Sequence, residues 1–137
     1  MPGMSAPFNV IFKEQIDMVA DYDLSVEYLE SLNSEYEPTY YEGIEIVNST
    51  GLLNGIDYEL SGEVANYGDE DVNFVLIEAA LFNKDGEIIG VVFTYAAGED
   101  ETLDVGATMP FDVWIPRHVE DTEIASYELF VNAKPIE

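Results

Sequence analysis

The sequence predicts an all-β fold, an antiparallel sandwich of about seven short strands, and three observations support this. Residues 56–66 alternate apolar and polar side chains with a period of two, as a half-buried strand does. Clusters of Asn, Asp and Gly separate the apolar runs at the spacing of turns in sandwiches. The runs between these clusters show no convincing helical periodicity, so strands should bury the apolar side chains.

The expected strands begin at residue 44. In chain order they span residues 44–48, 56–66, 72–82, 87–95, 103–105, 109–115 and 127–131. The run 72–82 is apolar on both sides of its alternation, which indicates burial on both faces. Residues 83–86, Asn-Lys-Asp-Gly, should close a tight hairpin, because Asp-Gly supplies a positive φ at low steric cost. Pro116 should stop the strand before it, since proline cannot donate to a sheet ladder.

Two blocks near the start of the chain recur near its end. Residues 3–12 match residues 106–115 and, after a two-residue insertion, residues 19–26 match residues 124–131. Eight positions are identical across the two blocks. Because order, spacing and loop length all agree, we interpret the chain as a piece of a tandem array whose modules are about 100 residues long.

This repeat divides the chain into three predicted parts. Residues 1–32 are the C-terminal strands of a preceding repeat, residues 33–40 a linker and residues 41–137 a complete module. The repeat also favours strands over the helix that residues 17–32 would otherwise allow. Strands cut from their own sheet keep unpaired edges, so these two extra N-terminal strands should dock on the module or exchange with a second molecule in a strand-exchanged homodimer. Neighbouring repeats of the same protein are the other expected partners.

Three segments of the module resemble a known family. They are residues 63–69, 79–90 and 103–111. Together they look like the FxLYD-type immunoglobulin-like domain of prokaryotic envelope proteins. Leu81 matches the Leu of the signature, Phe82 stands for the Tyr, Asn83 for the Asp, and Ala79 replaces the leading Phe. The resemblance implies an immunoglobulin/fibronectin-III-like sandwich, extracellular or on the cell surface, that serves as a non-catalytic structural or adhesion module of a larger surface or secreted protein.

Charge and residue usage exclude several classes of function. The chain has 29 Asp and Glu against 4 Lys and Arg, a formal net charge of −25, with 47% hydrophobic residues as in a globular protein. Nucleic-acid binding rests on clustered Lys and Arg, so no nucleic-acid partner is expected. Direct membrane insertion is not expected either, because no apolar run reaches about 18 residues. Cysteine is absent and His118 is the single histidine, so thiolate and multi-histidine metal sites are excluded.

Alternating strand directions predict one strongly acidic end. They place the loops 68–71, 97–101 and 116–126 there, together with the start of the first strand, and Arg117 is the nearby cation. Because Ca²⁺ takes roughly six to eight oxygen ligands, this end is a candidate calcium site at the junction with the preceding module. The candidate ligands are Asp69, Glu70, Asp71, Glu99, Asp100, Glu101, Glu120 and Asp121. A salt-adapted surface explains the same carboxylates, so both interpretations stay open.

The alternative function is therefore a calcium-dependent or carbohydrate-binding module that uses the acidic end, and calcium is the one cofactor that the sequence suggests. For stacking on a sugar, Tyr40 and Tyr41 are better candidates than Trp114, which is expected in the core. His118 has no Ser or Cys partner in its loop, so no catalytic residue is assigned and no enzyme is predicted. Asn48, followed by Ser and Thr, fits an N-glycosylation sequon at a loop edge.

Overall fold

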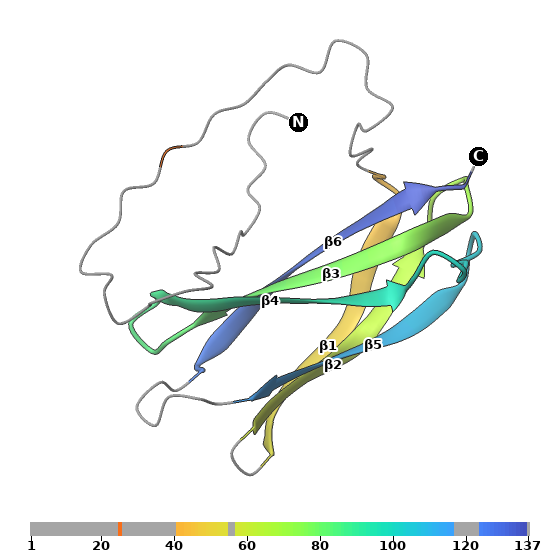
Figure 1. Ribbon diagram of the computed structural model, residues 1–137. Coiled ribbons are helices and arrows are strands. Elements are labelled where there is room, and N and C mark those ends of the chain that lie inside the picture. Colours follow the sequence, from red (N-terminus) through yellow and green to blue (C-terminus); the bar gives the residue numbers. More distant parts are fainter. Residues whose placement is uncertain (1–24, 26–40, 55–56, 117–123, 137) are drawn as a thin grey trace, which may run out of the picture.

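The computed structural model describes residues 25, 41–54, 57–116 and 124–136, and these contain strands but no helix (Figure 1). The strands are β1 (Ile44–Asn54), β2 (Asp57–Asn66), β3 (Val72–Phe82), β4 (Ile88–Ala97), β5 (Thr108–Pro116) and β6 (Ser126–Pro135). They form two three-stranded sheets, in the orders β1-β2-β5 and β4-β3-β6, and every pairing is antiparallel. The prediction of an all-β fold with antiparallel sheets is confirmed.

The hairpin between β3 and β4 follows from its own residues. Gly86 adopts a φ of 79°, the left-handed region that glycine enters without a steric penalty. Asn83 Oδ1 accepts hydrogen bonds from the backbone N–H groups of Asp85 (2.9 Å) and Glu87 (3.0 Å). The N–H of Asn83 also donates to the carbonyl of Glu87 at 3.0 Å. The predicted tight turn is therefore present, and a side-chain cap at its first residue holds it.

Strand boundaries differ most from the prediction at β1. This edge strand runs to Asn54 rather than to residue 48, because its ladder with β2 continues to the pair Asn54 and Asp57. A register shift between Ile46 and Asn48 marks a bulge in β1. The sequence beyond residue 48 mixes polar residues with Gly51 and two leucines and carries little strand signal of its own, so its partner strand determines its conformation.

The segment predicted as a strand at residues 103–105 is instead a single bridge. Leu103 and Val72 exchange backbone hydrogen bonds of 2.8 and 3.1 Å, and the chain then turns into β5. Because this segment does not cross the sandwich, β5 runs in the direction opposite to the one expected. Pro116 consequently pairs with Asp57, at the end of β2 far from Asn66.

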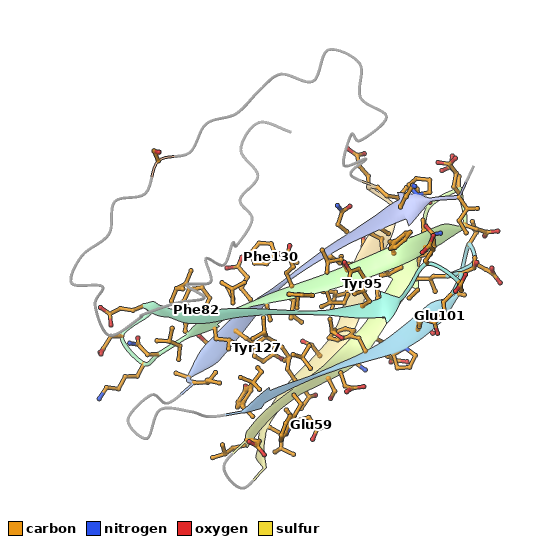
Figure 2. The ribbon with its side chains drawn as sticks, in the orientation of Figure 1. Glu59, Phe82, Tyr95, Glu101, Tyr127 and Phe130 are labelled. Carbon is orange, nitrogen blue, oxygen red and sulfur yellow. The ribbon has the colours of Figure 1, made fainter. Side chains whose placement is uncertain are left out.

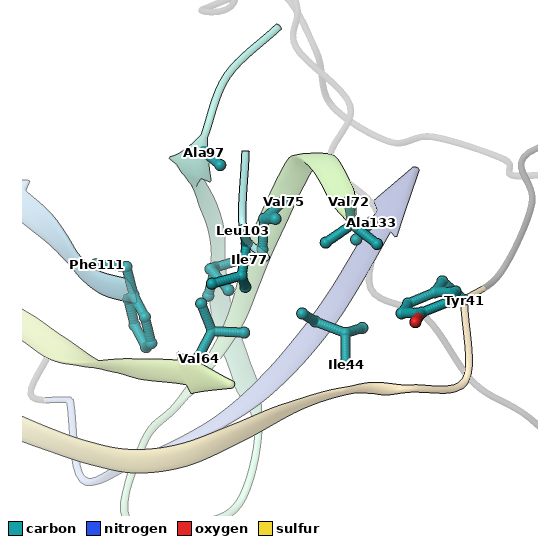
Figure 3. Packing of buried hydrophobic residues seen from close by; sticks show 10 residues of the cluster. All are labelled: Tyr41, Ile44, Val64, Val72, Val75, Ile77, Ala97, Leu103, Phe111 and Ala133. Atoms are coloured by element: carbon teal, nitrogen blue, oxygen red, sulfur yellow. The ribbon is translucent and has the colours of Figure 1, made fainter. Parts of the chain in front are cut away.

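The core lies between the two sheets and consists of two clusters. The first is drawn in Figure 3 and comprises Tyr41, Ile44, Val64, Val72, Val75, Ile77, Ala97, Leu103, Phe111 and Ala133. The second comprises Leu60, Ala79, Leu81, Val113 and Ile115, with Tyr58 and Tyr127 partly buried against it. Leu60 and Val64 are fully buried while Glu63 is exposed, which confirms the predicted alternation of β2.

Asn66 organises the end of the sandwich where β2 stops. Its side chain is fully buried, and its Nδ2 donates to the carbonyls of Glu70 (2.8 Å) and Leu103 (3.1 Å). Its Oδ1 accepts from the backbone N–H of Gly68 at 3.1 Å and from the Tyr41 hydroxyl at 3.3 Å. A buried amide that uses both its donor and acceptor groups in this way costs little to bury, and here it ties two connections to the core.

The described chain enters and leaves the sandwich at this same end (Figure 1). The Tyr41 hydroxyl, just before β1, shares its one proton between Asn66 Oδ1 and the carbonyl of Glu70, at 3.1 Å, and accepts from the N–H of Glu70 at 3.0 Å. Just after β6, the N–H of Ile136 donates to the carbonyl of Asp71 at 2.9 Å. The turn between β2 and β3 therefore bonds to the residues on both sides of the six-stranded body.

The predicted N-terminal strands and linker, residues 1–32 and 33–40, lie outside the described residues, apart from the exposed Ser25. The strand-exchanged homodimer rests on the same segment and stays a prediction.

Candidate functional site

Two acidic segments, residues 68–71 and 97–101, meet at the end of the sandwich where Asn66 lies. The N–H of Phe74 donates to the carbonyl of Gly98 at 3.2 Å, and Asn73 Nδ2 donates to the carbonyl of Glu99 at 3.3 Å. These bonds hold the β4–β5 connection against the start of β3. The six candidate calcium ligands here, Asp69, Glu70, Asp71, Glu99, Asp100 and Glu101, are all exposed.

Two of these carboxylates already have structural roles. Asp71 Oδ1 accepts a hydrogen bond from the N–H of Val105 at 2.8 Å, and Glu101 Oε2 accepts one from the N–H of Gly98 at 3.0 Å. Each bond caps a backbone N–H within the β4–β5 connection, as Asp and Glu commonly do in loops. The acidic residues at this end therefore shape the loops as well as charging the surface.

Within the described residues, no three His, Cys, Asp or Glu side chains come together as a group that could hold a metal ion. Glu120 and Asp121 lie outside the described residues. The expectation that the segment 116–126 emerges at the acidic end is wrong, because Pro116 pairs with Asp57 and Ser126 pairs with Phe82, both at the opposite end. The geometry thus unites two of the three predicted acidic loops, and the calcium site stays a prediction.

The basic residue near this end is also different from the one expected. Lys134 pairs with Asn73 at the start of β3, beside the acidic connections, and is exposed. Arg117, the cation assigned to this end from the sequence, lies outside the described residues, and β5 delivers the chain to the other end just before it. Arg117 was assigned to the wrong end because β5 runs in the direction opposite to the one expected.

Aromatic residues proposed for sugar binding occupy places other than those expected. Tyr41 is a core residue, only 7% exposed, with its hydroxyl bonded to Asn66 and Glu70. Trp114, expected in the core, is 63% exposed, because Val113 and Ile115 on either side of it point inward and a strand alternates. It stands on the outer face of β5, opposite Glu59 of β2. Tyr40 and His118 lie outside the described residues.

The outer face of sheet β4-β3-β6 is largely apolar, and no single sequence motif predicts this. We call it the aromatic face and define it as Leu76, Phe82, Ile88, Phe93, Tyr95 and Phe130. Figure 2 shows Phe82 and Phe130 on the side of this sheet that faces away from the other sheet, whereas Tyr127 lies between the sheets. Three of its members, Phe93, Ile88 and Tyr95, are 66%, 59% and 52% exposed. Contiguous exposed apolar surface of this kind commonly marks an interaction site.

The other outer face, on sheet β1-β2-β5, is mostly polar by contrast. Its rows across the sheet run Asn48, Glu63, Pro110 and then Thr50, Ser61, Asp112 and then Leu52, Glu59, Trp114. One sheet thus presents mainly carboxylates and hydroxyls to water, with Leu52 and Trp114 among them, while the other presents mainly aromatic and aliphatic side chains beside Glu78 and Glu128. The run 72–82 was predicted to be buried on both faces, and this prediction agrees with the apolar outer side of β3. Phe93 and Tyr95, two residues apart, carried a second signal that sequence reasoning missed.

The glycosylation triplet lies within β1 and not at a loop edge. Asn48 is exposed beside the β1 bulge, and its Nδ2 donates to Glu63 Oε2 at 3.3 Å. Its side chain is therefore on the surface, but on a paired strand.

Comparisons with known proteins give no match: no family model, no curated protein and no solved structure is significantly similar to the chain. The described residues contain no helix long and apolar enough to cross a membrane.

Proposed function

We propose that this chain is a non-catalytic structural or adhesion module of a larger surface or secreted protein, with an immunoglobulin-like sandwich of the FxLYD type. The observation that carries the proposal is the strand order. The first, second and fifth strands share one sheet, and the third strand lies between the fourth and sixth in the other. Immunoglobulin-like sandwiches place their A, B and E strands in one sheet and their C, C′ and F strands in the other in the same way.

The residues that carry the family resemblance have roles consistent with this proposal. Ala79 and Leu81 are buried between the sheets, as the apolar positions of a signature motif on a central strand would be. Asn83 stands where the motif has Asp, and its Oδ1 caps two backbone N–H groups of the hairpin. An Asp carboxylate accepts such bonds equally well. The motif therefore corresponds to the end of a strand followed by a turn that a side chain caps.

Neighbouring repeats are the proposed partners. The start of β1 lies at the same end as the acidic turn 68–71, as expected from the sequence, so a preceding module would lie near those carboxylates. In that arrangement the carboxylates at this end would repel acidic groups of the neighbour, and salt or counterions would screen the repulsion.

Surface labelling of intact cells tests the location that the proposal requires. Lys84 is exposed at the tip of the β3–β4 hairpin, so a membrane-impermeant amine reagent should modify it. We expect equal modification of Lys84 in intact and lysed cells of the source organism. Modification only after lysis would place the protein inside the cell and overturn the proposal.

A calcium-dependent or carbohydrate-binding module is the second candidate, favoured by the two acidic connections held together and by the exposed Trp114. Calorimetric titration of the whole chain with calcium chloride, against magnesium chloride at equal ionic strength, separates the two functions. The structural module should give no saturable heat with either salt. A saturable calcium signal lost in Asp100→Asn, or sugar binding lost in Trp114→Ala but kept in Phe93→Ala, would favour the second candidate.

A further inference from the structure

The aromatic face has the properties of a contact surface. Phe93 and Tyr95 pack edge to face, with ring centroids 6.3 Å apart and an interplanar angle of 84°, and they leave more than half of each side chain exposed. Across the sheet, Phe93 and Phe130 both pair with Glu78, so two aromatic residues flank a single carboxylate. In a chain with 29 acidic residues, a sheet face with so few charges leaves apolar area that association would bury.

Phe74, at the bulge near the start of β3, is a further exposed aromatic residue of this sheet. It is 37% exposed and has a φ of 45°, at the register irregularity near the start of β3. Glycine or asparagine would adopt this left-handed conformation at lower cost than a bulky aromatic residue. Strain of this kind is typical of contact sites, where the side chain has a role that its backbone conformation does not favour.

The sequence contains one segment whose chemistry matches this face. Residues 1–12 include no Asp, Glu, Lys or Arg, and they form the longest stretch of the chain without a charged side chain. Within them Phe8, Val10 and Phe12 recur with the period of a strand, so an extended segment would present three apolar side chains on one side. Lys13 follows directly and is the only cation before Lys84. It would complement Glu78 and Glu128, the carboxylates on the outer side of β3 and β6.

The segment is also long enough to reach the face from its own chain. Between Phe12 and Tyr41 lie 40 − 12 = 28 residues. Extended, they span up to about 90 Å, whereas β3, with its 11 residues, is only about 36 Å long. A tethered segment has an effective concentration of order millimolar, which favours it over a free second molecule or a separate partner.

We propose that residues 4–12 dock on the aromatic face of the same molecule, with Phe8, Val10 and Phe12 against Phe93, Tyr95 and Phe130. This docking covers the outer side of β3, which the sequence predicted to be buried on both faces. It does not depend on where the module functions.

A single spin label tests the proposal in the whole chain. The protein has no cysteine, so Asn9→Cys introduces one unique attachment point for a nitroxide, at a polar position between Phe8 and Val10. We expect a severalfold loss of NMR signal intensity at Phe93, Tyr95 and Phe130, with Trp114 on the other sheet unaffected. Adding Phe93→Glu should restore those intensities, whereas Trp114→Glu should not. These two side chains are 66% and 63% exposed, so neither change disturbs the core.

Each alternative outcome overturns the proposal. Signal loss in a mixture of spin-labelled and separately isotope-labelled chains, at the same level as within one chain, would assign the face to a second copy. Signal loss at Trp114, or none at the aromatic face, would show that residues 4–12 do not dock there. Loss that persists in Phe93→Glu would show that the aromatic rings are not the contact.

Discussion

Gly62 lies where β1, β2 and β5 approach one another closely. A Cβ atom at this position would meet the backbone oxygen of Asn48 in β1 and, at 2.7 and 2.9 Å, the ring of Phe111 in β5. The Phe111 ring therefore lies over the space that a side chain would need. This packing explains why a glycine stands at an inward position of β2, between the buried Leu60 and Val64.

Gly62→Ala should destabilise the fold by about 1–3 kcal/mol, the usual cost of overpacking a close-packed interior. Gly90→Ala is the matched control, because Gly90 is also a strand glycine but a Cβ there would meet only Leu81 Cδ1, at an ordinary 3.5 Å. It should leave stability within about 0.5 kcal/mol or raise it slightly, since a strand glycine is entropically costly. Urea unfolding of both variants measures the difference, and equal midpoints would contradict this packing.

The ionisation of Tyr58 should make the folding stability fall at alkaline pH. Burial raises the pKa of this phenol above 10.0, and the nearby Tyr127 raises it further. Because the folded pKa lies above the unfolded one, the folded state favours the neutral phenol, and the stability from this preference is complete below pH 10.0. It should be lost as pH rises through the folded pKa.

Unfolding midpoints measured across this alkaline range test the effect of Tyr58. The wild-type chain should lose stability more steeply than Tyr58→Phe, which has no phenol at this position to ionise. Parallel curves for the two proteins would show that Tyr58 does not couple ionisation to folding.

At the scale of elements, the β3–β4 hairpin depends on one side chain. Asn83→Ala removes two backbone-capping bonds and the bond from Nδ2 to Glu87 Oε2, so we expect a loss of about 1–2 kcal/mol. Asn83→Asp keeps both caps but replaces the bond to Glu87 with repulsion between carboxylates, so its loss should be smaller at acidic than at neutral pH. Thermal melts at the two pH values distinguish the variants, and an unperturbed Asn83→Ala melt would show that the cap is dispensable.

The elements also show which parts of a fold a single sequence reveals. The boundaries of β3 and the turn at Asn83 were predicted correctly, because alternation and Asp-Gly chemistry are local signals. The extension of β1 and the single bridge at Leu103 depend on partners remote in sequence, which local patterns do not encode. The bridge at Leu103 reversed the expected direction of β5 and so misplaced one acidic loop.

The distinction between local signals and contacts remote in sequence also applies to the candidate surfaces. Trp114 follows the alternation of Phe111, Val113 and Ile115, so its outward direction was present in the sequence, and only the general preference of Trp for cores argued otherwise. The buried position of Tyr41 depends on Asn66 and Glu70, about 25 and 29 residues away, and no local signal announces it.

For the whole molecule, the dominant property is its charge. With 29 acidic and 4 basic residues, mutual repulsion favours the expanded chain, and its range falls from about 10 Å at 0.1 M salt to about 3 Å at 1 M. The melting temperature should therefore rise from low to molar sodium chloride. Tetramethylammonium chloride at equal ionic strength should act similarly if screening is the cause. A melting temperature that does not change with salt would show that charge repulsion does not limit the stability of the fold.

The shared end of entry and exit determines how the module would respond to mechanical load. Tension applied through Tyr41 and Ile136 pulls on β1 and β6 from the end where both are anchored to one turn. The hydrogen bonds of each ladder would then break one after another, as in a zipper, instead of resisting together in shear. Such a body adds little length to a stretched chain while folded and should yield at low force, so a repeat array of these modules would lengthen under load by unfolding.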